Sequence, residues 1–112
     1  ERIEVIAPHP LARIRFNQCR IPITQQIGVG GDGFKMAMAT LDIFRSTVGA
    51  AALGFARHAL DEALNRTKSR QMFGAPMSRL QLIQAKLGEM SLDIDASSLL
   101  IYRAAWTKDN GA

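Results

Sequence analysis

The residues of this 112-residue sequence that are best suited to chemistry or ligand binding form two clusters. The first is Leu41-Asp42-Ile43-Phe44-Arg45, in which a carboxylate and a guanidinium stand three positions apart. On a helix this spacing puts both groups on one face, where a local ion pair is worth a few tenths of a kcal/mol. Because most such pairs are structural, spacing alone favours an ion pair over a ligand contact.

The second cluster is Arg70-Gln71-Met72-Phe73-Gly74-Ala75-Pro76, followed by Gln81. An arginine at the end of a helix complements the helix dipole. Alternatively, Arg70 and Gln81 flank one tight connection and converge on a shared anion, with the guanidinium fork donating to a phosphate. Residue chemistry alone leaves both explanations open.

A glycine-rich segment, Gly28-Val29-Gly30-Gly31-Asp32-Gly33, matches the G-x-G-x-x-G pattern of dinucleotide-binding folds. Those folds also need an apolar strand directly before the glycines and an acidic residue about 20 positions later, at the end of the next strand. Here the chain is in the middle of a predicted helix at that distance. We therefore interpret the segment as a strand-to-helix connection, in which Asp32 is placed to cap the following helix.

Two long helices are predicted to position both clusters. From Phe34 to about Ser69 only isolated glycines interrupt the helical character, and apolar residues recur at helical spacing. Phe73-Gly74-Ala75-Pro76 separates this helix from a second one that runs from about Arg79 to Lys108. Each helix has two apolar stripes. Because two antiparallel helices satisfy only one stripe on each, we expect further helices, as in a four-helix bundle.

The segment from Arg2 to Pro22 alternates apolar and polar residues in the manner of one or two short β-strands. Its apolar rows are Ile3 and Val5 and, after Pro8 and Pro10, Ala12, Ile14 and Phe16. Two strands are not stable alone, so we expect them to complete a sheet that lies outside this sequence. The predicted fold is mainly α, with residues 1–27 ending a β-domain and linker and residues 28–112 forming the first two helices of an incomplete bundle.

Composition narrows the class of protein. Hydrophobic residues make up 47% and charged residues 21%, as in globular proteins, and no methionine or leader precedes Glu1, so we expect a piece of a longer protein. The formal charge is +4, with ten arginines among the fourteen basic residues, which suits anionic ligands. The basic residues form no block and only seven aromatic residues accompany them, so we expect no nucleic-acid binding.

Other site classes find little support in the sequence. The single cysteine, Cys19, excludes an internal disulfide framework and is typical of a reducing compartment. His9 and His58 have no partner at metal-ligand spacing, so we expect no metal site and interpret both as structural or exposed. The longest apolar stretch, Ser46 to Ala56, falls well short of the ~20 residues that span a bilayer, so we expect no membrane span.

The motifs, taken together, resemble the acyl-CoA dehydrogenase family. That family shows F-x-x-x-R-[IV]-P, then G-x-G-F-x-x-A-M at a helix start, L-D-x-x-R, R-x-x-F-G-x-P, a glutamine, and A-W-x-x-D-x-G. The corresponding residues here are Phe16 to Pro22, Gly31 to Met38, Leu41 to Arg45, Arg70 to Pro76, Gln81, and Ala105 to Gly111. Each motif is weak alone, but their order and spacing are highly specific.

The resemblance implies an FAD enzyme that removes two hydrogens across the α,β carbons of an acyl-CoA thioester. A glutamate takes the α-proton, the β-hydride goes to the flavin, and an electron-transferring flavoprotein reoxidises it. By motif position, the residues contacting acyl-CoA are Asp42, Ile43, Phe44 and Arg45, and those contacting an FAD held mainly by the partner subunit are Arg70, Gln71, Met72, Phe73 and Gln81. A homodimer or homotetramer is implied, in the bacterial cytoplasm or the mitochondrial matrix.

One position departs from part of the family. Some subfamilies carry the catalytic glutamate directly before the L-D-x-x-R arginine, where this chain has Phe44, which accepts no proton. In most others the base lies further towards the C-terminus, so we expect it beyond Ala112. Asp42 is the nearest carboxylate, but pairing with Arg45 weakens it as a base. The alternative function is a non-catalytic helical oligomerisation module or an inactive relative on the same fold.

Overall fold

The computed structural model of the chain describes residues 1–6 and 10–111. The chain forms two compact units, Glu1–Gly33 and Phe34–Ala112. The predictions that involve Pro8 and His9 lie outside the described residues.

The first unit contains the two short strands that the sequence predicts. Strand β1 (Arg2–Ile3) pairs antiparallel with β2 (Leu11–Ala12), with Arg2 opposite Ala12 and Ile3 opposite Leu11. Next to this pair, the backbone N–H of Arg13 donates to the carbonyl of Glu1 over 2.8 Å. The alternating pattern continues past Ala12 without forming a strand, because no other described strand lies beside it to pair with.

The glycine-rich segment follows a single 3₁₀ turn, η1 (Ile23–Gln25), rather than a strand. Its closing contacts are local: Asp32 N–H donates to the carbonyl of Val29 over 3.1 Å, and Val29 N–H donates back to Oδ2 of Asp32 over 3.3 Å. The Asp32 side chain thus closes the turn before the first long helix. The missing strand supports the interpretation of this segment as a connection and not as a dinucleotide-binding turn.

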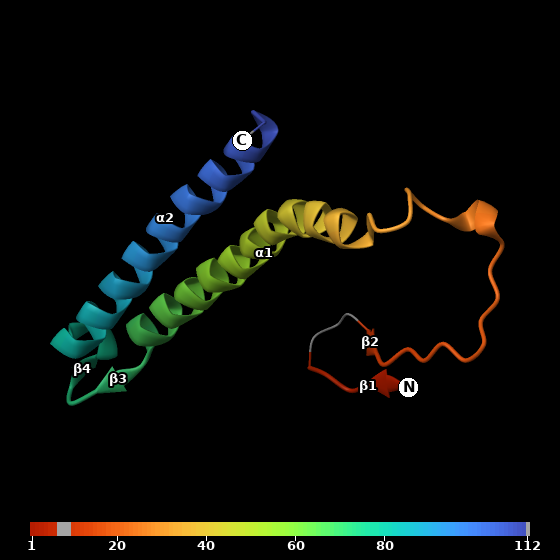
Figure 1. Cartoon of the computed structure of the whole chain (residues 1–112). Coiled ribbons are helices and arrows are strands. Elements are labelled where there is room, and N and C mark those ends of the chain that lie inside the picture. The colour runs from red at the N-terminus through yellow and green to blue at the C-terminus, as the bar shows by residue number, and fades with distance from the viewer. Residues whose placement is uncertain (7–9, 112) are drawn as a thin grey trace. The chain divides into compact units, whose positions relative to one another are not determined.

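The second unit consists of two long helices, as predicted. Helix α1 (Gly33–Ser69) has 37 residues and α2 (Gln81–Asp109) has 29, and Figure 1 shows them side by side, with the chain reversing between them. The predicted start of the second helix at Arg79 is too early. A 3₁₀ turn, η2 (Met77–Arg79), comes first, and Leu80 is extended at ψ 125° before α2 begins.

A β-hairpin with a two-residue turn joins the helices. The sequence predicted only an interruption between two helices at this point. Strand β3 (Gln71–Met72) pairs antiparallel with β4 (Ala75–Pro76). The two residues between the strands both have positive φ, +53° at Phe73 and +81° at Gly74. Positive φ at both central positions is the pattern of the type I′ turn, whose twist matches that of the two flanking strands.

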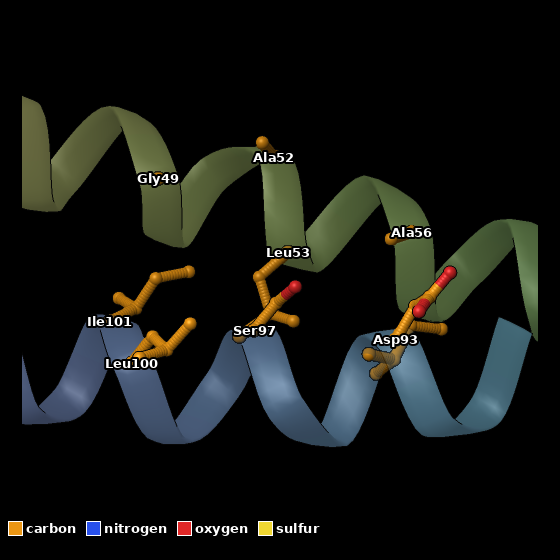
Figure 2. A pocket seen from close by; sticks show the side chains of 9 residues that line it. Gly49, Ala52, Leu53, Ala56, Asp93, Ser97, Leu100 and Ile101 are labelled. Carbon is orange, nitrogen blue, oxygen red and sulfur yellow. The ribbon is translucent and has the colours of Figure 1, made fainter.

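The two helices come close at Gly49 of α1. Ile101 of α2 lies against Gly49 of α1, and Leu53 is 6% exposed, the lowest value for an apolar residue in the described part of the chain. Figure 2 shows Leu53 and Ile101 pointing into the space between the helices, where a hollow of about 460 Å³ remains. Other apolar side chains stay open to solvent, with Phe55 77% and Leu99 72% exposed. Two helices therefore leave apolar surface for further helices to cover.

Candidate functional site

The first predicted cluster forms the expected ion pair on α1. Arg45 Nη1 lies 3.4 Å from Asp42 Oδ1 and donates a hydrogen bond to it. Both side chains are more than half exposed. Solvent reduces the contribution of such a pair to stability to a few tenths of a kcal/mol, so its contribution to the fold is small.

This pair borders a hollow of about 560 Å³ between α1 and α2. Asp42 and Arg45 line it from α1, whereas Ile43 and Phe44 are exposed and are not among its lining residues. The difference follows from the helix, because residues three apart share a face and their immediate neighbours are turned away by about 100° each. The structure thus brings together two of the four residues predicted to contact a substrate.

The hollow is also lined by three polar residues of α2 that were not predicted from the sequence: Arg103, Thr107 and Lys108. Their i, i+4, i+5 spacing is also that of an ordinary solvated helix face. A signal was nevertheless present, because an antiparallel pair of helices sets the end of the second beside the beginning of the first.

The second cluster is built into the hairpin. The N–H of Arg70 donates to the carbonyl of Arg66 over 2.9 Å, and the carbonyl of Arg70 accepts from Met77 N–H over 2.7 Å. Arg70 therefore ends α1 and also closes the hairpin. Its side chain is exposed and forms no ion pair with any described residue.

The remaining residues of this cluster follow along the same connection. Met72 is half-buried, whereas Gln71 and Gln81 are exposed. Leu80 N–H donates to the carbonyl of Met77 over 3.1 Å, which fixes the step from the hairpin into α2, where Gln81 is the first residue. The hydrogen bonds at Met77 thus connect Arg70 to the start of the second helix.

Phe73 at the tip of the hairpin combines strain with exposure. Its side chain is 90% exposed, and its φ of +53° lies in the left-handed region, which costs a residue with a Cβ atom roughly 1–2 kcal/mol. The type I′ turn accounts for the positive φ and leaves the ring open to solvent at the tip of the hairpin.

Residues 1–6 and 10–111 contain neither a candidate metal cluster nor a candidate membrane span. No three His, Cys, Asp or Glu side chains there are grouped so that they could hold a metal ion. No helix in this part of the chain is long and apolar enough to cross a membrane.

Comparison with known proteins points to one family. The profile of the acyl-CoA dehydrogenase C-terminal domain matches residues 31–112. The human mitochondrial short-chain specific acyl-CoA dehydrogenase is 48% identical over 99 residues, covering 88% of this chain and 24% of that protein. The probable acyl-CoA dehydrogenase FadE25 of Mycobacterium tuberculosis is 42% identical over 111 residues, covering 99% of this chain and 28% of that protein.

A solved structure gives the same answer for the fold. Butyryl-CoA dehydrogenase from Megasphaera elsdenii matches with a TM-score of 0.76 and 43% sequence identity, covering 81% of this chain and 24% of that one. The chain thus spans about a quarter of the length of these relatives. The profile match, these identities and the two-helix architecture agree, and the chain belongs to the acyl-CoA dehydrogenase family.

Proposed function

We propose that this chain is part of a flavin-dependent acyl-CoA dehydrogenase, which removes two hydrogens across the α,β carbons of an acyl-CoA thioester. The observation that carries the proposal is the family match over residues 31–112, which contains both clusters described above. An electron-transferring flavoprotein is the proposed acceptor that reoxidises the enzyme.

The α1 cluster is proposed to contact the acyl-CoA. Arg45 is the strongest candidate, because it lines the hollow between the helices and its exposed guanidinium is open to a ligand. Ile43 and Phe44 then contact the substrate from the adjoining side of the helix. Since Phe44 accepts no proton, a glutamate elsewhere in the protein is proposed to take the α-proton.

The hairpin cluster fits an FAD molecule. The side chains of Arg70, Gln71 and Gln81 are exposed hydrogen-bond donors suited to phosphate and flavin oxygens. Phe73 offers an exposed ring against which an aromatic cofactor packs. Met72, between Gln71 and Phe73, is proposed to contact the FAD as well. When bound, FAD supplies the acceptor for the hydrogen that leaves the β carbon. The family resemblance assigns this FAD mainly to the partner subunit, so the proposed enzyme is a homodimer or a homotetramer.

The test uses the full-length protein that carries this chain. Purified protein should be yellow, with flavin absorbance, and should oxidise a panel of acyl-CoA esters of different lengths when an electron-transferring flavoprotein is present. Butyryl-CoA is the first ester to try, because two relatives are named for short-chain substrates. A colourless protein that stays inactive on every ester after FAD is added would instead support the non-catalytic alternative.

A further inference from the structure

The hollow beside Asp42 and Arg45 carries more positive than negative charge. Three of its lining side chains are cationic, Arg45, Arg103 and Lys108, and one is a carboxylate, Asp42. Asp42 pairs with Arg45, whereas Arg103 and Lys108 form no ion pair within residues 1–6 and 10–111. The α2 side of the hollow therefore presents cations without a counter-charge from the described chain.

The helix dipole accounts for the position of one of the two cations on α2 but not for that of the other. Lys108 lies in the last turn of α2, where the helix dipole itself favours a cation. Arg103 lies more than a turn before Asp109, the last residue of α2, and beyond the reach of that effect. Arg103 is therefore the cation of the hollow that neither the helix dipole nor an ion pair within the described chain accounts for, and its exposed side chain is open to an anionic ligand.

Besides the apolar Leu100 and Ala104, the hollow has two uncharged polar residues that suit an anion. Ser46 of α1 and Thr107 of α2 line it, and neither hydroxyl donates a hydrogen bond to a described residue. Thr40 and Thr47, also on α1, do donate to carbonyls of their own helix. Two free hydroxyls and a guanidinium fork are the donors that phosphate oxygens accept from.

We propose that this hollow binds the phosphate groups of the acyl-CoA, with Arg103 of α2 as the principal contact and Ser46 and Thr107 as further donors. This rests on the proposed function, because it extends the acyl-CoA site from α1 to the facing helix. The coenzyme part of an acyl-CoA carries a pyrophosphate and a 3′-phosphate, so it brings the negative charge that the hollow lacks.

The experiment compares two thioesters on the full-length enzyme: butyryl-CoA and S-butyryl-pantetheine, which has the same reacting carbons and no nucleotide phosphates. Arg103→Gln should raise KM for butyryl-CoA about threefold to tenfold, or about 0.7 to 1.4 kcal/mol at 1.4 kcal/mol per decade, with kcat within about twofold. For S-butyryl-pantetheine, KM and kcat should not change. Arg103→Lys should raise KM for butyryl-CoA less than Arg103→Gln does. Arg57→Gln is the control, because Arg57 is exposed on α1 and outside the hollow.

The proposal would be overturned if Arg103→Gln raised KM equally for both thioesters, or for neither. Equal increases in KM together with a lower Tm would show that Arg103 pairs with a carboxylate of a neighbouring helix. If neither variant folds, salt dependence decides: the wild-type KM should rise with ionic strength for butyryl-CoA only, and parallel curves refute the phosphate contact.

Failure of the proposed function is separable from failure of this inference. If the wild-type protein oxidises neither thioester, the proposed enzymatic function is refuted. Titration with free coenzyme A then tests whether the hollow binds its phosphate groups. Binding to wild type that weakens in Arg103→Gln but not in Arg57→Gln supports the phosphate contact, whereas absent or unchanged binding rejects it.

Discussion

Ile101 of α2 lies directly beside the position that a side chain at residue 49 of α1 would take. A Cβ atom added to Gly49 would lie 3.4 Å from Cγ1 and 3.6 Å from Cδ1 of Ile101 (Figure 2). At Gly54, five residues further along the same helix, an added Cβ would meet nothing within 4 Å. A methyl group at position 49 would thus just touch Ile101 and a larger, branched side chain would crowd it, whereas position 54 is open in the described chain.

This difference predicts opposite results for two matched substitutions. Gly49→Val should lower the Tm of the full-length protein, because the branched side chain overpacks against Ile101 at a cost of about 1–3 kcal/mol. Gly54→Val makes the same change in helix propensity without that contact, so it should be neutral or slightly stabilising. Thermal unfolding of both variants gives the comparison, and equal Tm values would mean that Gly49 is not a packing position.

The strained turn predicts that stability and flavin affinity change in opposite directions at Phe73. Phe73→Asn should raise the stability of the FAD-free protein by about 1 kcal/mol, because asparagine tolerates positive φ far better than phenylalanine. The same change should weaken FAD binding, since the exposed ring is lost. Unfolding of the apoprotein and FAD titration measure the two effects.

Gly74→Ala is the companion variant, because it strains a residue at φ +81° and leaves the ring in place. It should destabilise the apoprotein. If Phe73→Asn binds FAD as tightly as wild type, the ring makes no contact with the flavin.

The isolated 112-residue chain should not fold into a rigid structure. Exposed aromatic residues lie along both helices, among them Phe34, Phe55 and Trp106, and nothing in the described chain covers them. We expect strong helical circular dichroism with little near-ultraviolet signal from Trp106, dye binding typical of a molten state, and aggregation. Cooperative unfolding together with stoichiometric FAD binding by this chain would contradict the prediction.

The long helices could be predicted from sequence because their apolar period is sustained over many turns, and the loop glycines mark their limits. The hairpin between them could not. Its turn places a phenylalanine at a positive φ, which propensity opposes, so Phe73-Gly74 indicated only a break. Beyond Ala12 the alternating pattern predicted a strand that the described chain does not form, because a strand also needs a partner to pair with.

The candidate site was predictable only where motif and local geometry coincide. Asp42 and Arg45 are neighbours on one helix, so their spacing fixes their contact. Arg103 reaches the same hollow from another helix, and its position depends on how α1 and α2 align, which is set by packing at residues such as Gly49. A contact determined by packing leaves no pattern within α2 itself.

Arg45→Ala should reduce catalysis more than stability. Its ion pair with Asp42 is more than half exposed, so losing it should cost less than about 1 kcal/mol of unfolding free energy. If Arg45 contacts the acyl-CoA, as proposed, kcat/KM should fall by tenfold or more, since charged hydrogen bonds are worth about 1.5–3 kcal/mol. Steady-state kinetics measure the effect on catalysis and thermal unfolding measures the effect on stability, with Arg57→Ala as control. Unchanged kinetics would mean that Arg45 has only a structural role.

Arg70→Ala should loosen the flavin. The Arg70 side chain is exposed beside the hairpin and forms no ion pair within the described chain, and a guanidinium fork suits a pyrophosphate better than an ammonium does. Loss of one charged hydrogen bond, at roughly 1.5–3 kcal/mol, should weaken FAD binding about tenfold to a hundredfold or more at 1.4 kcal/mol per decade. Arg70→Lys should restore only part of the affinity.

The contact is proposed to cross a subunit interface, which adds a second measurable result. A ligand that binds the assembled state stabilises it in proportion to its affinity, so FAD should stabilise the wild-type oligomer more than the Arg70→Ala oligomer. FAD titration of the three apoproteins, with oligomer mass followed alongside, tests both effects. Arg66→Ala is a matched control, because Arg66 is an exposed arginine of the last turn of α1. Equal FAD affinities in wild type, Arg70→Ala and Arg70→Lys would mean that Arg70 only ends α1 and closes the hairpin through its backbone.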